Sequence, residues 1–206
     1  MKNITIVDYN CGNLLSLKRG IEKIGFKCEI SREANKILNS THVILPGVGA
    51  FGSAIKLLKN YDLENIIKRY TLEMQKPLLG ICLGMQLLLT KSFEFGEHKG
   101  LDIIPGEAVK IDQITKNKVK IPNIGWNEIN TQEDINFNQF NKKSFYFIHS
   151  FVSVTNEKAD TIAYCDYYKI KIPSIIKKNK IIGCQFHPEK SSNNGLKFLQ
   201  NFCNTE

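Results

Sequence analysis

Short apolar runs alternate with helix-periodic segments through the first half of the sequence. Four runs have the length and composition of buried strands, at residues 4–7, 28–30, 42–45 and 78–81. Apolar residues recur at helical spacing in segments between or after these runs, at residues 14–24, 51–58, 63–74 and 85–89. Strands that alternate with helices lie parallel and are joined by right-handed crossovers. This half therefore predicts a mainly parallel central sheet.

Strand-like runs dominate the second half of the sequence. They occur at residues 107–111, 126–130, 145–149, 161–165, 170–176 and 181–186, and a helical pattern returns only at residues 196–202. Neighbouring strands without helices between them pair antiparallel, so we expect an antiparallel extension of the same sheet. A length of 206 residues suits one compact α/β domain, and we expect that domain to span residues 1–206.

A cysteine lies between the fourth apolar run and the helical segment after it. Residues 80–86 read Gly-Ile-Cys-Leu-Gly-Met-Gln. A G-x-C-x-G turn between a strand and a helix is typical of a nucleophile elbow, which pushes the central side chain into a cleft. The N-terminus of the following helix would stabilise a Cys82 thiolate, and the Leu83 N–H would face a developing oxyanion. A buried cysteine in a tight turn is the alternative for so short a motif.

A histidine and a glutamate follow the apolar run at residues 181–184. Residues 185–189 read Gln-Phe-His-Pro-Glu. In an extended segment residues two apart share a face, so Glu189 could orient His187 towards a thiol. Neutral histidine is a natural general base for cysteine, and a carboxylate fixes its tautomer. A surface loop turned by Pro188 is the alternative, which the cysteine elbow elsewhere in the chain disfavours.

The glycine-rich segment at residues 47–52 matches G-x-G-x-x-G and follows an apolar run. In dinucleotide-binding folds this pattern is followed, about 20 residues later, by an acidic residue at the end of the next strand. Here the following residues run through helical segments towards Glu73 instead. We therefore favour a strip whose backbone N–H groups line the thiol's pocket and supply a second oxyanion donor.

Composition and charge narrow the range of partners. The formal net charge is +8, with a small cluster at Lys116, Lys118 and Lys120. No nucleic-acid-binding motif accompanies these lysines, so a solvated face is favoured and no nucleic-acid partner is expected. The six cysteines are scattered and no metal-ligand spacing occurs, so we expect no disulfide, metal or other cofactor. Without a signal peptide or a membrane-spanning run, we expect a cytoplasmic protein.

Together these motifs resemble the class I (triad) glutamine amidotransferases. Further segments of the chain match that family in order, at residues 8–14, 45–51, 146–150 and 186–191. Within the family, the chain is similar to the glutaminase subunits that serve histidine biosynthesis. The resemblance covers essentially the whole chain and implies a flavodoxin-like α/β fold.

The resemblance also implies roles for individual residues in the hydrolysis of L-glutamine through a Cys thioester. Cys82 would be the nucleophile, His187 the base and Glu189 its orienting partner, with oxyanion N–H groups from Val48 and Leu83. The residues implied to hold the glutamine are Gly49, Gln86, Glu94, Ser150 and Phe151. The residues implied to lie on the face towards a synthase subunit are Asn13, Asn123 and Trp126.

The synthase implied by the resemblance is a separate polypeptide, a (β/α)₈ cyclase that forms a heterodimer with this chain and receives its ammonia. That partner would make imidazole glycerol phosphate and an aminoimidazole carboxamide ribotide. One position departs from the family: residues 122–127 read Pro-Asn-Ile-Gly-Trp-Asn, where the family usually has P-H-x-G-W-N. Asn123 therefore leaves open a related subunit that supplies ammonia to a surface-sugar-modifying synthase.

Two alternatives come from other functional classes. A regulatory relative that keeps the elbow only for packing would have an incomplete triad, whereas all three triad residues are present here. A nucleotide-binding protein would bind NAD through the glycine-rich segment.

Overall fold

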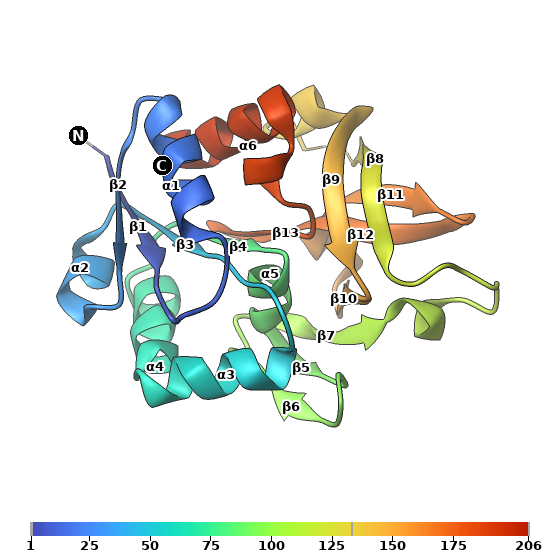
Figure 1. Ribbon diagram of the computed structural model, residues 1–206, viewed down its shortest axis with the longest axis horizontal. Helices are drawn as coiled ribbons and strands as arrows, with labels where there is room; N and C mark the ends of the chain where they lie inside the picture. Colours follow the sequence, from blue (N-terminus) through green and yellow to red (C-terminus); the bar gives the residue numbers. More distant parts are fainter. Residues whose placement is uncertain (1, 133, 206) are drawn as a thin grey trace.

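The computed structural model describes residues 2–132 and 134–205, so residues 1, 133 and 206 of the expected domain lie outside the described residues. Figure 1 shows a long twisted sheet with helices on both of its faces and a smaller sheet beside one end of the helical layer. The two sheets are in contact, since β10 of the smaller sheet packs against β12 of the larger one. The fold is therefore mixed α/β around a central sheet.

The larger sheet has nine strands within the described residues, in the order β2-β1-β3-β4-β13-β12-β11-β8-β9. The bounds of its strands are β1 Asn3–Val7, β2 Lys27–Ser31, β3 His42–Leu45, β4 Leu78–Ile81, β8 Asn123–Thr131, β9 Lys143–His149, β11 Thr161–Tyr167, β12 Ile170–Lys178 and β13 Ile181–Cys184. The strands from β2 to β13 in this order run parallel, and β12, β11, β8 and β9 continue antiparallel. The predicted parallel sheet with an antiparallel extension is confirmed.

A second sheet, in the order β10-β7-β5-β6, was not expected from the sequence. Its strands are β5 Leu89–Ser92, β6 His98–Lys99, β7 Ile104–Lys110 and β10 Phe151–Thr155. The run at residues 107–111 pairs with β5 and β10, so its expected place in the main sheet was wrong. Buried residues alternate with partly exposed ones along β7. That pattern identifies a half-buried strand but does not say which sheet the strand joins.

Helices cover both faces of the main sheet (Figure 1). The helices on one face, in mutual contact, are α1 Leu14–Lys23 and α6 Ser192–Asn204. The helices on the other face are α2 Ala34–Asn39, α3 Phe51–Asn60, α4 Leu63–Lys68 with a π-helical continuation at Arg69–Glu73, and α5 Leu83–Leu87. Short 3₁₀ turns occur at Ile111–Ile114, Asn138–Phe140, Lys158–Asp160 and Pro188–Lys190. No helix of the described residues is long and apolar enough to span a membrane.

Each helix layer buries its own apolar core against the sheet. In β3, Ile44 belongs to the core on the α1 and α6 side, whereas Val43 and Leu45 belong to the core on the α3 and α4 side. Successive strand residues point to opposite faces, so a parallel strand covered on both faces is apolar throughout. This explains the continuous apolar composition of residues 43–45 in the first half of the sequence.

Stacked aromatic rings fix the end of β13 against its neighbours. The Phe186 ring stacks on Phe145 of β9 with centroids 4.1 Å apart and meets Phe198 of α6 edge-on at 5.0 Å. Pairs of this kind contribute about 0.5–1.5 kcal/mol each beyond the area that they bury. Because His187 follows Phe186 directly, this packing places the histidine.

Three chain segments leave adjacent strands at the same edge of the main sheet. β3, β4 and β13 are neighbours and parallel, so their C-terminal ends meet. Residues 46–49 follow β3, Cys82 follows β4, and residues 185–187 follow β13. The crevice outside the carboxyl ends of parallel strands is the usual ligand site of such sheets. The sheet therefore gathers the glycine-rich strip, the cysteine and the histidine in one place.

Candidate active site

Cys82 lies in a strained turn between β4 and α5. Its backbone has φ 54° and ψ −109°, a positive φ that non-glycine residues rarely adopt. The flanking glycines are required by close approach: a Cβ on Gly84 would collide with the carbonyl oxygen of Leu45, and one on Gly80 would lie 2.7 Å from the Gly84 oxygen. The Cys82 N–H donates to the Cys184 carbonyl at 2.7 Å. This is the geometry of a nucleophile elbow.

His187 and Glu189 form a buried pair. His187 Nδ1 lies 2.8 Å from Glu189 Oε1, and each side chain is 4% exposed. A 3₁₀ turn at Pro188–Lys190 brings the two together, rather than the extended segment that we expected. The carboxylate only accepts hydrogen bonds, so Nδ1 carries a proton and Nε2 is left for chemistry. Among the described residues Nε2 has no hydrogen-bond partner.

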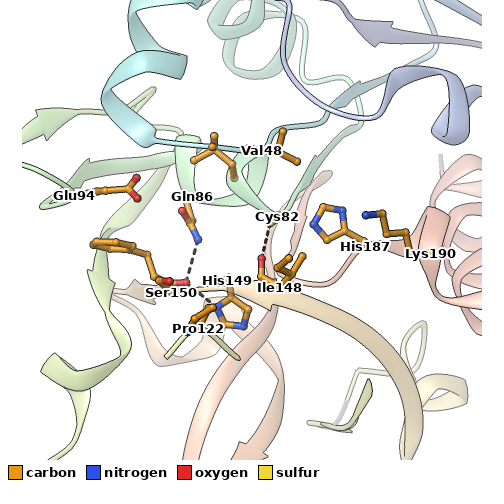
Figure 2. A pocket seen from close by; sticks show the side chains of 13 residues that line it. Val48, Cys82, Gln86, Glu94, Pro122, Ile148, His149, Ser150, His187 and Lys190 are labelled. Atoms are coloured by element: carbon orange, nitrogen blue, oxygen red, sulfur yellow. Dashed lines mark hydrogen bonds between the residues drawn. The ribbon is translucent and has the colours of Figure 1, made fainter. Parts of the chain in front are cut away.

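The electrostatic setting of His187 favours the imidazolium. Burial by itself lowers the pKa of His187, but the neighbouring Cys82 sulfur and the Glu189 carboxylate together raise it above its usual value. A neutral His187 was expected from the sequence, whereas this arrangement favours a protonated His187 at neutral pH. Figure 2 shows the side chains of Cys82 and His187 next to each other, and both line the same cavity. The His187 imidazolium beside Cys82 can deliver a proton to the group that leaves the carbon atom attacked by the cysteine sulfur.

The cavity beside Cys82 has a volume of about 360 Å³. Its lining consists of Val48, Gly49, Cys82, Leu83, Gln86, Glu94, Pro122, Ile148, His149, Ser150, Phe151, His187 and Lys190. The structure thus brings together every residue expected to bind glutamine or stabilise an oxyanion. In Figure 2 the carboxylate of Glu94 and the amide of Gln86 lie along the cavity away from His187. A small polar substrate with an amide and charged ends suits such a lining.

Two polar side chains of the lining are held by backbone groups. Glu94 Oε2 accepts the Phe51 N–H at 2.7 Å, at the start of α3. Gln86 Nε2 donates to the Phe151 carbonyl at 3.1 Å. Hydrogen bonds of this kind fix side-chain orientation in a site that is already formed.

The Val48 N–H of the glycine-rich strip after β3 is bound to the thiol of Cys11. Val48 N donates to Cys11 Sγ at 3.4 Å, and the Cys11 thiol donates back to the Val48 carbonyl at 2.8 Å. Tyr9, fully buried in the loop between β1 and α1 that also carries Cys11, donates to the Pro46 carbonyl at 2.6 Å. Gly49 has φ +90°, a value that favours glycine. The expected Val48 donor is therefore engaged by Cys11 in this conformation.

The other expected oxyanion donor is placed differently. Leu83 is the first residue of α5, and the N–H groups of a helix's first turn have no acceptor within the helix. Leu83 also lines the cavity beside Cys82. Its N–H is therefore the better placed of the two donors here.

The residues expected on the partner face do not share one surface. Asn13 is exposed and Trp126 is 52% exposed, whereas Asn123 is fully buried. Asn123 and Trp126 are three apart in β8, so their side chains point to opposite faces of the sheet. Asn123 faces inwards, where its amide nitrogen lies 3.1 Å from Nε2 of His149. Asn123 is therefore buried within this chain rather than exposed on the expected partner face.

Four lining residues had no assigned role in the sequence interpretation: Pro122, Ile148, His149 and Lys190. Ile148 and His149 directly precede Ser150 and Phe151, so their place next to these expected glutamine-binding residues was the available signal. Lys190 follows Glu189, and its ammonium lies 5.9 Å from the Tyr146 ring centre. The contact of Cys11 with Val48 joins residues 37 apart, and no local pattern indicates it.

Comparisons with known proteins agree with this geometry. Residues 5–205 match the family model described as glutamine amidotransferase class-I. The chain is 41% identical over 204 residues to the imidazole glycerol phosphate synthase subunit HisH of Lactococcus lactis, with 98% of each chain covered. It is 43% identical over 201 residues to the protein of the same name from Caldanaerobacter subterraneus, covering 97% of this chain and 96% of that one.

Solved structures show the same fold at low sequence identity. The crystal structure of a glutamine amidotransferase matches with a TM-score of 0.75 at 16% identity, covering 98% of this chain and 99% of that chain. A chain of the Thermotoga maritima PurLQS structure matches with a TM-score of 0.72 at 16% identity, covering 98% of both chains.

Proposed function

This chain belongs to the class I glutamine amidotransferase family, and we propose that it is the glutaminase subunit of an imidazole glycerol phosphate synthase. The observation that carries the proposal is the buried His187–Glu189 pair, whose histidine lines the same cavity as Cys82, Gln86 and Glu94. The whole-length similarity to synthase subunits named HisH supports the pathway. Residues 1–206 act as one glutaminase domain that needs no cofactor.

The reaction proceeds through a thioester on Cys82. The thiolate attacks the side-chain amide carbon of glutamine, and the carbonyl oxygen takes up the negative charge. His187 Nε2–H then protonates the departing nitrogen, ammonia leaves, and a γ-glutamyl thioester remains. Water, deprotonated by the now neutral His187, attacks the thioester carbon and releases glutamate and the thiolate. Glu189 holds the imidazole in the required tautomer and stabilises the imidazolium.

The oxyanion is held by the N–H of Leu83 and, after a turn of its peptide, the N–H of Val48. In the present conformation the Val48 N–H is bound to Cys11, so one donor is missing. Loss of one oxyanion donor typically costs about 10²–10³-fold in rate. The isolated subunit is therefore nearly idle, and contact with a loaded synthase favours the turned-in peptide.

The ammonia passes to a (β/α)₈ cyclase that forms a heterodimer with this chain in the cytoplasm. Support for a docking face comes from large apolar side chains that are 40–56% exposed around the cavity, namely Val48, Ile124, Trp126 and Ile148. Ile124 and Ile148 are paired across β8 and β9. The rings of Trp126 and Tyr146 are in edge contact, with centroids 6.1 Å apart. Exposed apolar clusters of this kind mark protein interaction sites.

The alternative partner, a surface-sugar-modifying synthase, was motivated by Asn123. Because Asn123 is buried on the inner face of β8, it gives no reason to prefer that partner. The proposed cyclase is therefore favoured.

Co-purification from the native cell tests the choice of partner. The tagged chain is isolated and the bound protein is identified by mass spectrometry, with a Trp126→Glu variant as the matched control for the apolar face. The proposal predicts a cyclase of the histidine pathway that is lost with the variant and that raises glutamate release by the chain. Recovery of a sugar-modifying synthase instead would refute the pathway while leaving the glutaminase chemistry in place.

A further inference from the structure

A chain of buried hydrogen bonds runs through the cavity wall and ends at the nucleophile. Gln185 Nε2 donates to Cys82 Sγ at 3.7 Å. Gln86 Nε2 donates to Gln185 Oε1 and to the Phe151 carbonyl, at 3.1 Å in each case. Gln185 is fully buried and Gln86 is 5% exposed. These two amides therefore join the sulfur to the backbone of β10.

The same carbonyl is also bound by His149. His149 Nδ1 lies 2.8 Å from the Phe151 oxygen, a bond that Figure 2 draws together with that of Gln86. A carbonyl only accepts, so Nδ1 carries the proton and Nε2 of the neutral ring accepts. The amide nitrogen of Asn123 lies 3.1 Å from Nε2, and Asn123 Oδ1 accepts from Asn127 at 3.0 Å. Donors and acceptors alternate through this part of the chain.

The protonation of His149 agrees with this pattern. Burial lowers the pKa of His149 to about 4, with a further decrease from His187 and an opposing effect of the bond to the Phe151 carbonyl. At neutral pH the ring is therefore neutral and Nε2 can accept. A side chain at position 123 that offers no donor would leave a buried acceptor unpaired, which typically costs about 1–3 kcal/mol.

We propose that Asn123, His149 and Gln185 are positioning residues for the glutaminase reaction. Gln185 supplies a donor to the Cys82 sulfur, and Gln86 ties Gln185 to the Phe151 carbonyl. The Asn123–His149 pair fixes that carbonyl from behind, so the cavity wall and the nucleophile keep one geometry. The inference rests on the proposed glutaminase function.

Each end of the chain has a separate consequence for the reaction. The Gln185 donor stabilises negative charge on sulfur, so it increases the reactivity of the thiol towards any electrophile. The Asn123–His149 pair touches no reacting atom and acts only through Phe151 and Gln86. Its loss lets the carbonyl move, so it slows turnover more than it weakens glutamine binding.

Two readouts test the proposal, and one of them needs neither glutamine nor a synthase. The rate of Cys82 alkylation by iodoacetamide is followed by peptide mass spectrometry, and kcat and KM for glutamine are measured in the complex. Gln185→Leu should slow Cys82 alkylation about tenfold, the scale of one hydrogen bond to a charged group. Asn123→Leu should lower kcat about three- to tenfold, with KM changed less than about twofold on the same scale.

Asn123→His and Asn130→Leu provide the matched comparisons. Histidine retains an N–H that can donate to His149, so Asn123→His should keep kcat within about twofold of the wild type. Asn130, also in β8, bonds to exposed Asp166 instead, so Asn130→Leu should react like the wild type. If Asn123→Leu does not fold, the smaller Asn123→Ala removes the same donor and should show the same fall in kcat.

The proposal is overturned if Gln185→Leu alkylates at the wild-type rate, or if Asn123→His is as slow as Asn123→Leu. It is also overturned if the loss in Asn123→Leu appears in KM alone. A wild-type complex without glutaminase activity, but with the expected alkylation pattern, would refute the proposed function and leave the positioning of the thiol standing.

Discussion

The imidazole Nδ1 of His187 lies 2.8 Å from a carboxylate oxygen of Glu189, with both side chains 4% exposed. The pair leaves Nε2 without a hydrogen-bond partner among the described residues, on the wall of the cavity that also holds Cys82. His187 moves the proton, and Glu189 orients the imidazole of His187. These unequal roles can be separated by substitution.

Glu189→Gln should slow glutamine hydrolysis less than His187→Ala. A general acid–base group typically contributes about 10²–10⁴-fold, and removal of His187 forfeits that contribution. Glutamine at position 189 still offers an oxygen to Nδ1, although without the charge that stabilises the imidazolium. Steady-state glutamate release in the complex measures both variants. A slower Glu189→Gln enzyme would show that the two roles are assigned the wrong way round.

Cys11→Ala should raise the basal glutaminase rate of the isolated chain. The Cys11 thiol accepts the Val48 N–H and donates to the Val48 carbonyl. Two such contacts hold the peptide in its present orientation by about 1 kcal/mol, so their loss should increase basal turnover several-fold, up to about tenfold. Glutamate release without a synthase is the measurement.

Cys11→Ser and Cys28→Ala are the controls for that experiment. Serine keeps a donor and an acceptor at position 11, so Cys11→Ser should keep the low basal glutaminase rate of the wild type. Cys28 lies in β2 with its thiol near the Glu29 carbonyl rather than the strip, and its substitution should have no effect. If glutamate release by the isolated chain, the complex and the complex with an acceptor analogue is equal, the oxyanion hole is preformed and Cys11 holds nothing back.

The free energy of unfolding should fall as the pH is lowered from about 6.5 to 4. Burial lowers the pKa of His149 to about 4, so in this window the unfolded chain binds a proton that the folded chain excludes. The stability present above pH 6.5 is thereby lost on acidification, by about 3 kcal/mol for this group. His187, with its raised pKa, has the opposite sign and loses its contribution only on the alkaline side.

Urea unfolding across this range in the wild type and in His149→Gln measures the effect. The fall in the free energy of unfolding with pH should be smaller in the variant but still present, because burial and Lys2 also lower the pKa of His42 to about 4. Parallel pH profiles for the two proteins would mean that His149 takes up its proton without unfolding.

The sequence indicates the parts of this structure that depend on local pattern. Strands that are covered on both faces must be apolar, so the runs that became β1, β3 and β4 are recognisable. The elbow at Cys82 and the residues around His187 are also contiguous motifs. By contrast, β5 and β6 are short, and the pairing of β7 with β5 and β10 depends on contacts across the fold.

The site residues that the sequence did not indicate are fixed by long-range contacts. Gln185 and Cys82 are 103 residues apart, and Asn123 and His149 are 26 apart. Asn123 is buried on the inner face of β8 and Trp126 is exposed on the outer face, because strand residues three apart point to opposite faces. Strand parity settles such a question once the bounds of the strand are known.

Glutamate release by Cys82→Ala and Cys184→Ala, each in complex with the synthase, tests the catalytic assignment most directly. Cys184 is fully buried in β13, and burial raises the pKa of its thiol well above the usual value, so it is the matched cysteine without access to substrate. Cys82→Ala should lose activity by at least about 10⁴-fold, the scale seen when a triad nucleophile is removed, while its unfolding midpoint stays close to that of the wild type. Cys184→Ala should retain most activity. Wild-type glutamate release by Cys82→Ala would contradict the thioester mechanism.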